Sequence, residues 1–284
     1  MDDTMENNEY NLYAERVPNG TQPSKELIKE ALRLSELDED AYWELITALW
    51  RRGTSEILED ARQLCHSPDP VERRLGANIL GQLGARPGVF HEERLMALLE
   101  VLGGEEDEDV LVAACTGLGH LADTRANGAL IHLKNHQDED VRHAVAFGLS
   151  GELDEASISV LVELSEDEDA DVRNWATFRL GSKDALDVPD IPQALAARLD
   201  DPHEDTRCEA IVGLARRKDA RALEPLIVEL QATKDVTTYN LQLLLEAARE
   251  LADPKLCASL LGLRYEGMED SSLDEALAEC ACTL

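Results

Sequence analysis

Apolar residues recur every three or four positions along most of this chain. In one stretch, for example, Val141, Val145 and Leu149 fall on a single face of a helix. A half-buried β-strand would instead alternate apolar and polar residues with a period of two. The spacing therefore predicts an all-α protein.

The helical pattern contains a repeated phrase. It consists of an Arg, a small or apolar residue three positions later, and a Leu followed by a small residue after a further helical turn. Copies start at residues 72, 110, 141, 172 and 206, with Leu111 replacing the Arg in the second copy. A recurrence within about 20–50 residues is typical of repeat proteins.

Shorter helices are predicted between the copies, over residues 55–64, 92–102, 127–134, 156–164, 191–199 and 222–230. An Asp is expected to open several of these helices; the residues concerned are Asp123, Asp154, Asp219 and Asp253. Each unit is thus a helical hairpin. Because one hairpin leaves an apolar face exposed to water, neighbouring hairpins must stack into a solenoid.

These units resemble HEAT repeats, in the short bacterial HEAT-like variety also called phycobilin-lyase-type repeats. The resemblance implies a right-handed α-α superhelix, a HEAT-like solenoid of about seven to eight helical hairpins. We expect a single solenoid over residues 24–284 with degenerate capping units at both ends, and a mobile or extended leader over residues 1–23. Ser24 is expected to cap the first helix. The resemblance does not assign an activity, because this family serves many functions.

The chain is strongly acidic, with 59 Asp and Glu against 27 Lys and Arg and a formal charge of −32. This charge disfavours binding to nucleic acid or to anionic membranes, which depends on cationic side chains. It favours attraction to a basic protein partner. The sequence favours a monomer but does not determine the oligomeric state.

The cysteines are scattered and form no CxxC pair; they are Cys65, Cys115, Cys208, Cys257, Cys280 and Cys282. We interpret them as small buried thiols in a reducing compartment. The sequence contains no apolar run of about 20 residues and no signal peptide at its start, so a cytoplasmic protein is predicted.

Acidic residues cluster just before the second helix of several units. The predicted acidic edge comprises Glu105, Glu106, Asp107, Glu108, Asp109, Asp138, Glu139, Asp140, Asp167, Asp169, Asp171, Asp200, Asp201 and Asp205. One interpretation is solubility together with helix capping. The alternative is a docking ridge for a basic partner, because four or five carboxylates per turn exceed what capping requires.

The repeated arginines have two interpretations as well. Arg73, Arg142, Arg173 and Arg207 either bind an anion or form a structural ladder with the acids of the turns. Repeats that resemble these units favour the ladder, and Asp138, Asp169 and Asp201 lie within reach.

The sequence indicates no catalytic residue, no metal site and no cofactor. The di-iron site of deoxyhypusine hydroxylase, a relative of this repeat family, requires His-Glu pairs on the second helices. The matching offsets here, such as His143-Ala144 and Cys208-Glu209, do not supply both ligands. Zinc spacing, a GxSxG motif and a Gly-rich phosphate loop are also missing from the sequence. We therefore expect a protein that is not an enzyme.

Two of the three Phe residues, Phe147 and Phe178, take the same offset in adjacent copies, where this kind of repeat normally places a polar residue on the concave face. Thr116 and Val212 take that offset in the flanking copies, and His143 and Asn174 would border the strip. The strip is either a partner-binding groove, since exposed aromatic side chains often carry binding energy, or part of the core. Trp175 is expected in the core.

The sequence thus predicts a non-enzymatic scaffold that holds a basic protein partner in its groove and on its acidic edge. The most concrete form is an immunity-type inhibitor of a toxin. The alternatives are a phycobilin-lyase-like tetrapyrrole chaperone or transferase and a general assembly adaptor. The tetrapyrrole alternative would need free arginines in the groove, such as Arg74, Arg179, Arg216 and Arg249.

Overall fold

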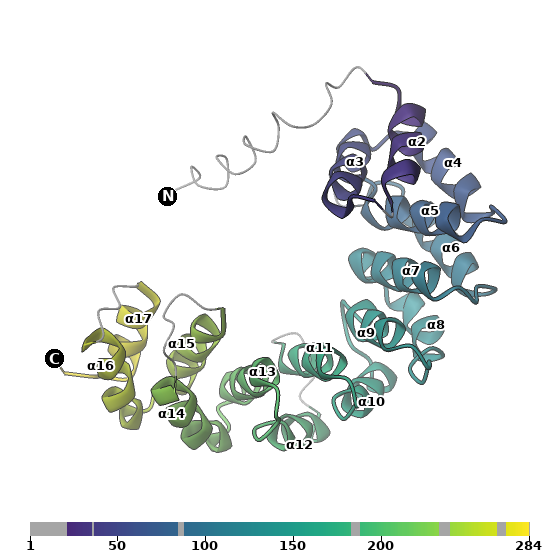
Figure 1. The fold of residues 1–284 in the computed structure, drawn as a ribbon. Helices are drawn as coiled ribbons and strands as arrows, with labels where there is room; N and C mark the ends of the chain where they lie inside the picture. The colour runs from purple at the N-terminus through teal and green to yellow at the C-terminus, as the bar shows by residue number, and fades with distance from the viewer. Residues whose placement is uncertain are drawn as a thin grey trace. The chain divides into compact units, whose positions relative to one another are not determined.

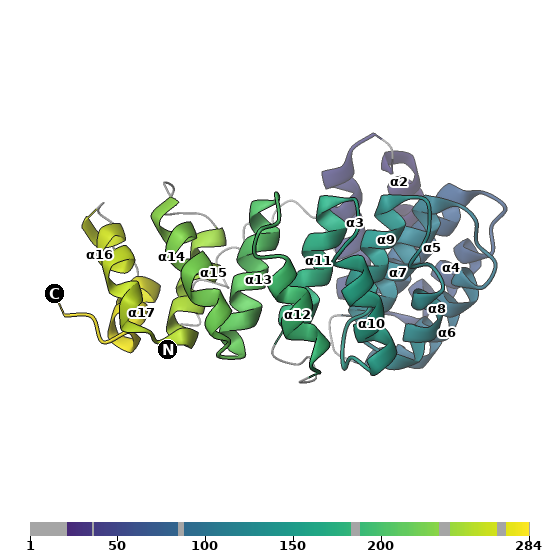
Figure 2. The ribbon, with the colours of Figure 1, turned by 90° about the horizontal axis from the view of Figure 1, so that it is seen from below.

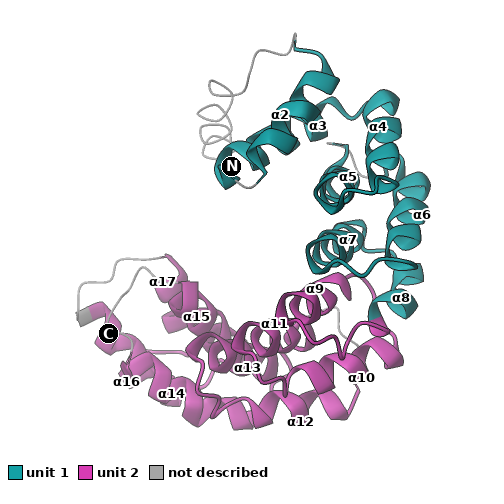
Figure 3. Cartoon of the chain, turned by 45° about the vertical axis from the view of Figure 1, so that its right-hand side comes forward, with its two compact units in different colours: residues 1–130 teal, residues 131–284 magenta. Residues whose placement is uncertain are grey.

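The computed structural model describes residues 22–35, 37–84, 88–182, 188–232, 239–265 and 271–283. Within these ranges the chain forms helices and no strand, so the all-α solenoid predicted from the spacing is confirmed (Figure 1). Of the predicted leader, only Gln22 and Pro23 belong to the described residues. The chain has two compact units, residues 1–130 and 131–284 (Figure 3).

Unit 1 (residues 1–130) is a stack of helical hairpins. Its helices are α2 (Ser24–Leu34), α3 (Glu39–Arg52), α4 (Ser55–Cys65), α5 (Pro70–Gln82), α6 (His91–Leu102) and α7 (Glu108–Leu121). The 3-10 turn η1 (Thr124–Ala126) and the short helix α8 (Asn127–Ile131) follow at its end. Helix α5 packs against α3, α4 and α7, so it lies in the middle of this unit.

Unit 2 (residues 131–284) continues the alternation of helices. Its elements are α9 (Glu139–Gly148), α10 (Glu155–Leu164), α11 (Ala170–Gly181), α12 (Asp190–Ala197), α13 (Glu204–Arg216), η2 (Ala220–Ala222), α14 (Leu223–Ala232), α15 (Tyr239–Leu251), η3 (Pro254–Leu256), α16 (Cys257–Tyr265) and α17 (Ser271–Glu279). One layer contains α9, α11, α13, α15 and α17, and the other contains α10, α12, α14 and α16 (Figure 3). Figure 2 shows the helices α12 to α17 side by side.

The predicted apolar stripe forms the core between the layers. Val141, Val145 and Leu149 each have 0% of their surface exposed. Pairs of glycines bring successive second helices close together in each unit. A Cβ on Gly81 would lie 2.7 Å from the Cα of Gly117 in unit 1, and a Cβ on Gly213 would lie 2.7 Å from the Cα of Gly181 in unit 2. The small residues of the repeated phrase therefore set the helix spacing.

Aspartates open the shorter helices, as the sequence predicted. The side chains of Asp123, Asp154, Asp219 and Asp253 each accept a hydrogen bond from the first turn of the element that follows. The prediction for Ser24 is wrong. Ser24 is itself the first helical residue of α2, and its hydroxyl accepts a hydrogen bond from Arg52 Nη1 at 3.2 Å.

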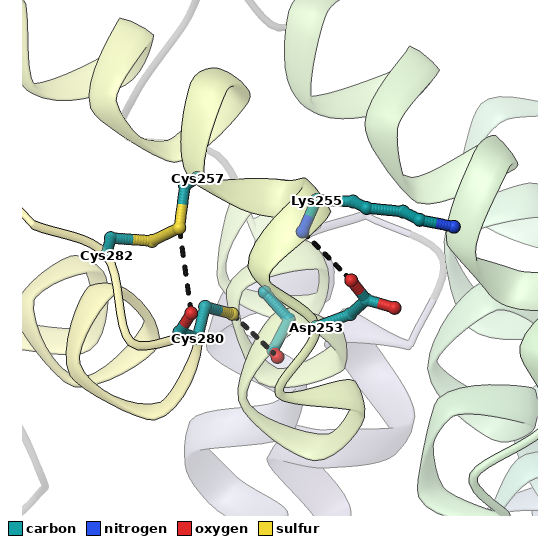
Figure 4. Close-up of a disulfide and its surroundings, with 6 residues drawn as sticks. Asp253, Lys255, Cys257, Cys280 and Cys282 are labelled. Atoms are coloured by element: carbon teal, nitrogen blue, oxygen red, sulfur yellow. Dashed lines mark hydrogen bonds between the residues drawn. A yellow bond between two sulfur atoms is a disulfide. The ribbon is translucent and has the colours of Figure 1, made fainter.

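The cysteine interpretation is wrong for two of the six residues. Cys257, at the start of α16, and Cys282, just after α17, form a disulfide with Cα atoms 5.4 Å apart (Figure 4). Their sequence separation of 25 residues hid the pairing, because the hairpin of α16 and α17 brings them together.

The four remaining cysteines, Cys65, Cys115, Cys208 and Cys280, are buried free thiols. Burial raises the pKa of the first three to about 12 and that of Cys280 to about 11. These thiols therefore stay protonated and unreactive at neutral pH.

Candidate functional site: an aromatic cluster on unit 2

Four ring side chains from α9 and α11 gather into one cluster. Trp175 is the centre: its ring lies 5.3 Å from that of Phe147, 5.3 Å from that of Phe178 and 5.7 Å from that of His143, centroid to centroid. All three pairs are edge-to-face, with interplanar angles of 85°, 88° and 75° respectively. This geometry is the favoured one for aromatic pairs. We call these four residues the aromatic cluster.

The cluster lies at the surface of the helix layer, because each of its four side chains is half-buried. Helical spacing explains the arrangement. His143 and Phe147 are four residues apart on α9, and Trp175 and Phe178 are three apart on α11, so each pair shares one helix face. Trp175 was expected in the core, and that expectation is wrong: the ring spans the junction of α9 and α11 and keeps part of its surface exposed.

The other residues predicted for the strip, Val212, Thr116 and Asn174, are not part of the aromatic cluster. Val212 has 0% of its surface exposed, so its assignment to the groove is wrong. Val212 is next to Gly213, where the backbone of α13 comes close to Gly181 of α11. Thr116 is half-buried on α7 in unit 1, where it lines a different cavity. Asn174 is half-buried beside Trp175.

Carboxylates near the start of α9 and α11 border the aromatic cluster and affect the pKa of His143. Burial lowers the pKa of His143, while the charges of Asp171, Asp140 and Asp169 oppose that shift. Asp140 and Asp171 are exposed. The cluster is therefore an apolar surface with a negative border.

The predicted acidic edge divides into exposed and engaged carboxylates. The exposed members are Glu106, Glu108, Asp109, Glu139, Asp140, Asp171 and Asp200. Asp107, Asp138 and Asp169 are N-caps of α7, α9 and α11, and they accept backbone amides at 3.0–3.2 Å. Asp205 accepts a hydrogen bond from Asn240 at 2.7 Å. The remaining three, Glu105, Asp167 and Asp201, are engaged by arginines, and among the exposed members Asp109 also bonds Arg74.

The four repeated arginines connect successive turns. Arg173 is representative: its Nη1 donates to the carbonyl oxygens of Asp167 and Glu168 at 2.9 and 3.0 Å, and its Nε and Nη2 donate to both carboxylate oxygens of Asp201 at 3.0 Å. Equivalent carboxylate partners are Glu105 for Arg73, Asp167 for Arg142 and Glu229 for Arg207. Each arginine bonds an acid of the next hairpin, and Arg73, Arg142 and Arg173 do so although an aspartate caps their own helix.

Burial and hydrogen bonding oppose each other at the ladder carboxylates. Burial would raise the pKa of Asp201, whose side chain is 2% exposed, but hydrogen bonds from Arg173 and the His203 amide lower the pKa overall. The same balance lowers the pKa of Asp167 beside Arg142. The ladder therefore keeps these carboxylates ionised within the fold.

A second set of arginines, which the sequence did not reveal, binds the carbonyl groups at helix ends. Arg94 is buried and donates to the carbonyl oxygens of Leu80 and Gly81 at 2.5 and 2.7 Å. Burial lowers its pKa to about 10. Arg217 donates in the same way to Leu180 at 2.9 Å. Their positions differ from copy to copy, so no repeated motif marks them.

The arginines required by the tetrapyrrole alternative are engaged. Arg74 bonds Asp109 at 3.1 Å, Arg179 bonds the Leu149 carbonyl at 3.1 Å, Arg216 bonds Glu246 at 3.0 and 3.1 Å, and Arg249 bonds Glu275. Each guanidinium would have to exchange these partners for a propionate.

Glu209 on α13 is a buried carboxyl group, which the sequence marks only as half of an incomplete His-Glu ligand pair. Its exposed fraction is 4%. Burial raises its pKa to about 7; Arg216 opposes this shift, Glu246 and Asp205 add to it, and a hydrogen bond with Tyr239 opposes it. Among the described residues, no group of three or more His, Cys, Asp or Glu is arranged to hold a metal ion. None of the helices in that part of the chain combines the length and apolar character needed to cross a bilayer.

Comparison with known proteins supports the repeat assignment. Residues 95–181 match a family described as HEAT repeats. Protein YibA of Escherichia coli strain K12 is 36% identical over 91 residues, which are 32% of this chain and 31% of YibA. The matched stretch thus spans about a third of that curated relative.

One solved structure shows the same fold over a longer stretch. The X-ray structure of Escherichia coli YibA aligns with a TM-score of 0.68 at 24% identity, covering 100% of this chain and 99% of that chain. The complex of CpcE and CpcF of phycocyanin lyase from Nostoc sp. PCC7120 aligns with a TM-score of 0.49 at 17% identity, covering 80% of this chain and 94% of that one. The HEAT-like repeats predicted from the sequence are confirmed; likeness at these identities concerns the fold alone.

Proposed function

We propose that this scaffold of HEAT-like repeats is a non-enzymatic binding protein that holds a basic protein partner on the aromatic cluster of unit 2. The observation that carries the proposal is the half-buried, edge-to-face arrangement of Phe147, Trp175 and Phe178, bordered by exposed carboxylates. HEAT-like repeats typically mediate protein interaction through such stacked helix surfaces.

The cluster has the physical properties of a binding hot spot. Its rings hold each other in place, so little conformational entropy is lost when a partner covers them. Aromatic side chains of this kind carry a large share of the binding energy in protein interfaces. Asp140 and Asp171 at the border supply charge complementarity for Lys and Arg of the partner.

The most concrete form of this proposal is an immunity-type inhibitor that sequesters a toxin, such as a cationic nuclease domain. A general assembly adaptor would use the same surface. The net charge of −32 supports a basic partner in either case. The tetrapyrrole role is not proposed, because the arginines that it needs are held by carboxylates and carbonyl groups. Visible absorbance of the purified protein would contradict this choice.

Removing both phenyl rings tests the site. Phe147→Ala combined with Phe178→Ala should weaken partner binding at least about tenfold, equivalent to about 1.4 kcal/mol, because it removes two of the rings that contact the partner. The melting temperature should change by only about a few degrees, since both rings are half-buried. The partner is recovered by pull-down and mass spectrometry, and its affinity is measured by calorimetry.

Val228→Ala is the matched control, because it trims an apolar side chain of unit 2 that is 60% exposed and lies on α14, outside the cluster. Its affinity for the partner should equal that of the wild type. Equal binding by the double variant and the control would refute the proposed site, and collapse of the double variant would assign both rings to the core.

The acidic border should act mainly on the association rate. The rate constant measured by stopped flow should fall markedly between low and physiological salt, because salt screens attraction over about 8–10 Å. Asp140→Asn with Asp171→Asn should slow association at low salt and flatten this dependence, since both carboxylates are exposed. A rate that does not respond to salt would remove the acidic border from the mechanism.

A further inference from the structure

Unit 1 contains a cavity of about 620 Å³ that the proposed function does not use. Its walls come from the segment that leads into α3, from α3 itself and from α7, with α5 between them. The lining residues that matter here are Leu37, Glu39, Tyr42, Trp43, Arg74 and Asp109. The volume falls within the range of about 300–1,000 Å³ that is typical of ligand pockets.

The cavity combines apolar surface with negative charge. Leu37 is 73% exposed and Trp43 is 39% exposed, although both are large apolar side chains. The Trp43 ring is held edge-to-face against the buried Tyr42 ring, at 5.4 Å and 76°, and an amide of Asn78 donates to the Tyr42 hydroxyl at 2.8 Å. An exposed indole is thus fixed in position at the cavity.

The charges that line the cavity are unbalanced. Three carboxylates, those of Asp38, Glu39 and Asp109, face one guanidinium, that of Arg74. Arg74 donates to Asp109 at 3.1 Å and to the Ser35 carbonyl at 3.4 Å, yet the Asp109 side chain remains 74% exposed. The cavity therefore has an excess of negative charge, and the Arg74–Asp109 pair shows that a guanidinium can bond the Asp109 carboxylate there.

We propose that this cavity binds an arginine side chain from an extended segment of a protein partner. The guanidinium would stack on Trp43 and pair with Asp109 and Glu39, while an apolar neighbour in the segment would cover Leu37. Arginine suits this site better than lysine, because its planar group both stacks on an indole and bonds carboxylates in pairs. The inference goes beyond the proposed function, since the cavity belongs to unit 1 and its test does not need the partner of the aromatic cluster.

The test uses the full chain and a short peptide, acetyl-Leu-Arg-Leu-amide, titrated by calorimetry at physiological salt. Saturable 1:1 binding is expected. The same peptide with citrulline, which keeps the shape of arginine without its charge, should not bind measurably. Trp43→Ala should weaken binding about fivefold, as expected for loss of a cation–π contact. Circular dichroism checks that this variant is folded.

Asp109→Asn gives a second, independent variant on the exposed surface, so the test survives if Trp43→Ala fails to fold. It should weaken peptide binding about threefold or more. Glu108→Gln is its matched control, because Glu108 is an exposed acid beside Asp109 on α7 that does not line the cavity; it should change binding by less than about twofold.

Two results would overturn the inference. One is equal weakening by Asp109→Asn and Glu108→Gln, which would indicate attraction to the overall negative charge only. The other is equal binding of the arginine and citrulline peptides. The double variant at Phe147 and Phe178 should bind the peptide like the wild type, so failure of the unit 1 cavity and failure of the aromatic cluster can be told apart.

Discussion

Replacing Arg173 with Ala should lower the free energy of unfolding by about 3–5 kcal/mol, the range found when one partner of a buried ion pair is removed. Asp201, whose side chain is 2% exposed, would lose two hydrogen bonds of 3.0 Å and stay buried, with only the His203 amide at 3.0 Å and the Arg198 guanidinium at 3.7 Å to offset its charge. The carbonyl groups of Asp167 and Glu168 would lose their donor as well. Urea denaturation followed by circular dichroism at pH 7 measures the change.

The loss of unfolding free energy in the Arg173→Ala variant should depend on pH. The folded pKa of Asp201 is lowered in the wild type, so the stability that Asp201 contributes is present above the ordinary aspartate pKa of 3.8 and is lost as pH falls through the folded value. In the variant, protonation at acid pH relieves the buried charge. The difference between the two proteins should therefore shrink as the pH approaches 3.8 and below.

Arg221→Ala is the matched control for this experiment. Arg221 also bonds an aspartate, Asp219, at 2.5 Å, but its side chain is 39% exposed. Exposed ion pairs contribute about 0–1 kcal/mol, so this variant should lose little stability. Similar losses in both variants would show that the ladder does not bridge the repeats energetically.

Replacing Glu209 with Gln should stabilise the protein at alkaline pH by as much as about 3 kcal/mol, because each unit of pKa shift corresponds to about 1.4 kcal/mol. Glu209 has a folded pKa of about 7 against an ordinary value of 4.5. The folded state therefore binds the proton more tightly than the unfolded state does. The stability contributed by the protonated group is present below pH 4.5 and is lost as pH rises through 7.

Glutamine keeps the size of the side chain and cannot ionise. The stabilisation should consequently be small near pH 4.5 and reach its full value above pH 7. Urea denaturation at a series of pH values measures it. Glu224→Gln, which removes an exposed carboxylate on α14, should give no such pH-dependent gain. If the unfolding free energies of Glu209→Gln and the wild type differed by the same amount at every pH, the raised pKa of Glu209 would be contradicted.

The regular features of the fold followed from the sequence because they depend on local spacing. The periodic apolar residues placed the helices, and the recurring Asp residues marked where the shorter elements begin. The repeated Arg was also visible, since a residue that recurs in each hairpin takes the same place in each. The carboxylate partner of each Arg was less certain, because the nearby Asp138 and Asp169 cap their own helices.

The site itself depended on contacts between hairpins. The sequence singled out Phe147 and Phe178 by their shared offset but assigned Trp175, which joins them, to the core. It gave Val212 the same role as the two Phe residues, although tight packing around α13 buries it completely. The disulfide of Cys257 and Cys282 and the burial of Glu209 have no periodic signal either.

By itself, then, the sequence determined the class of fold, the hairpin unit and the excess of negative charge, because helix periodicity and composition are local properties of the chain. Only the tertiary structure decided which carboxylates remain exposed, which arginines are already bonded and where aromatic surface stays open in unit 1 and in unit 2. Exposure and pairing depend on how closely each helix packs against its neighbours, and that distance is set by side chains from separate repeats.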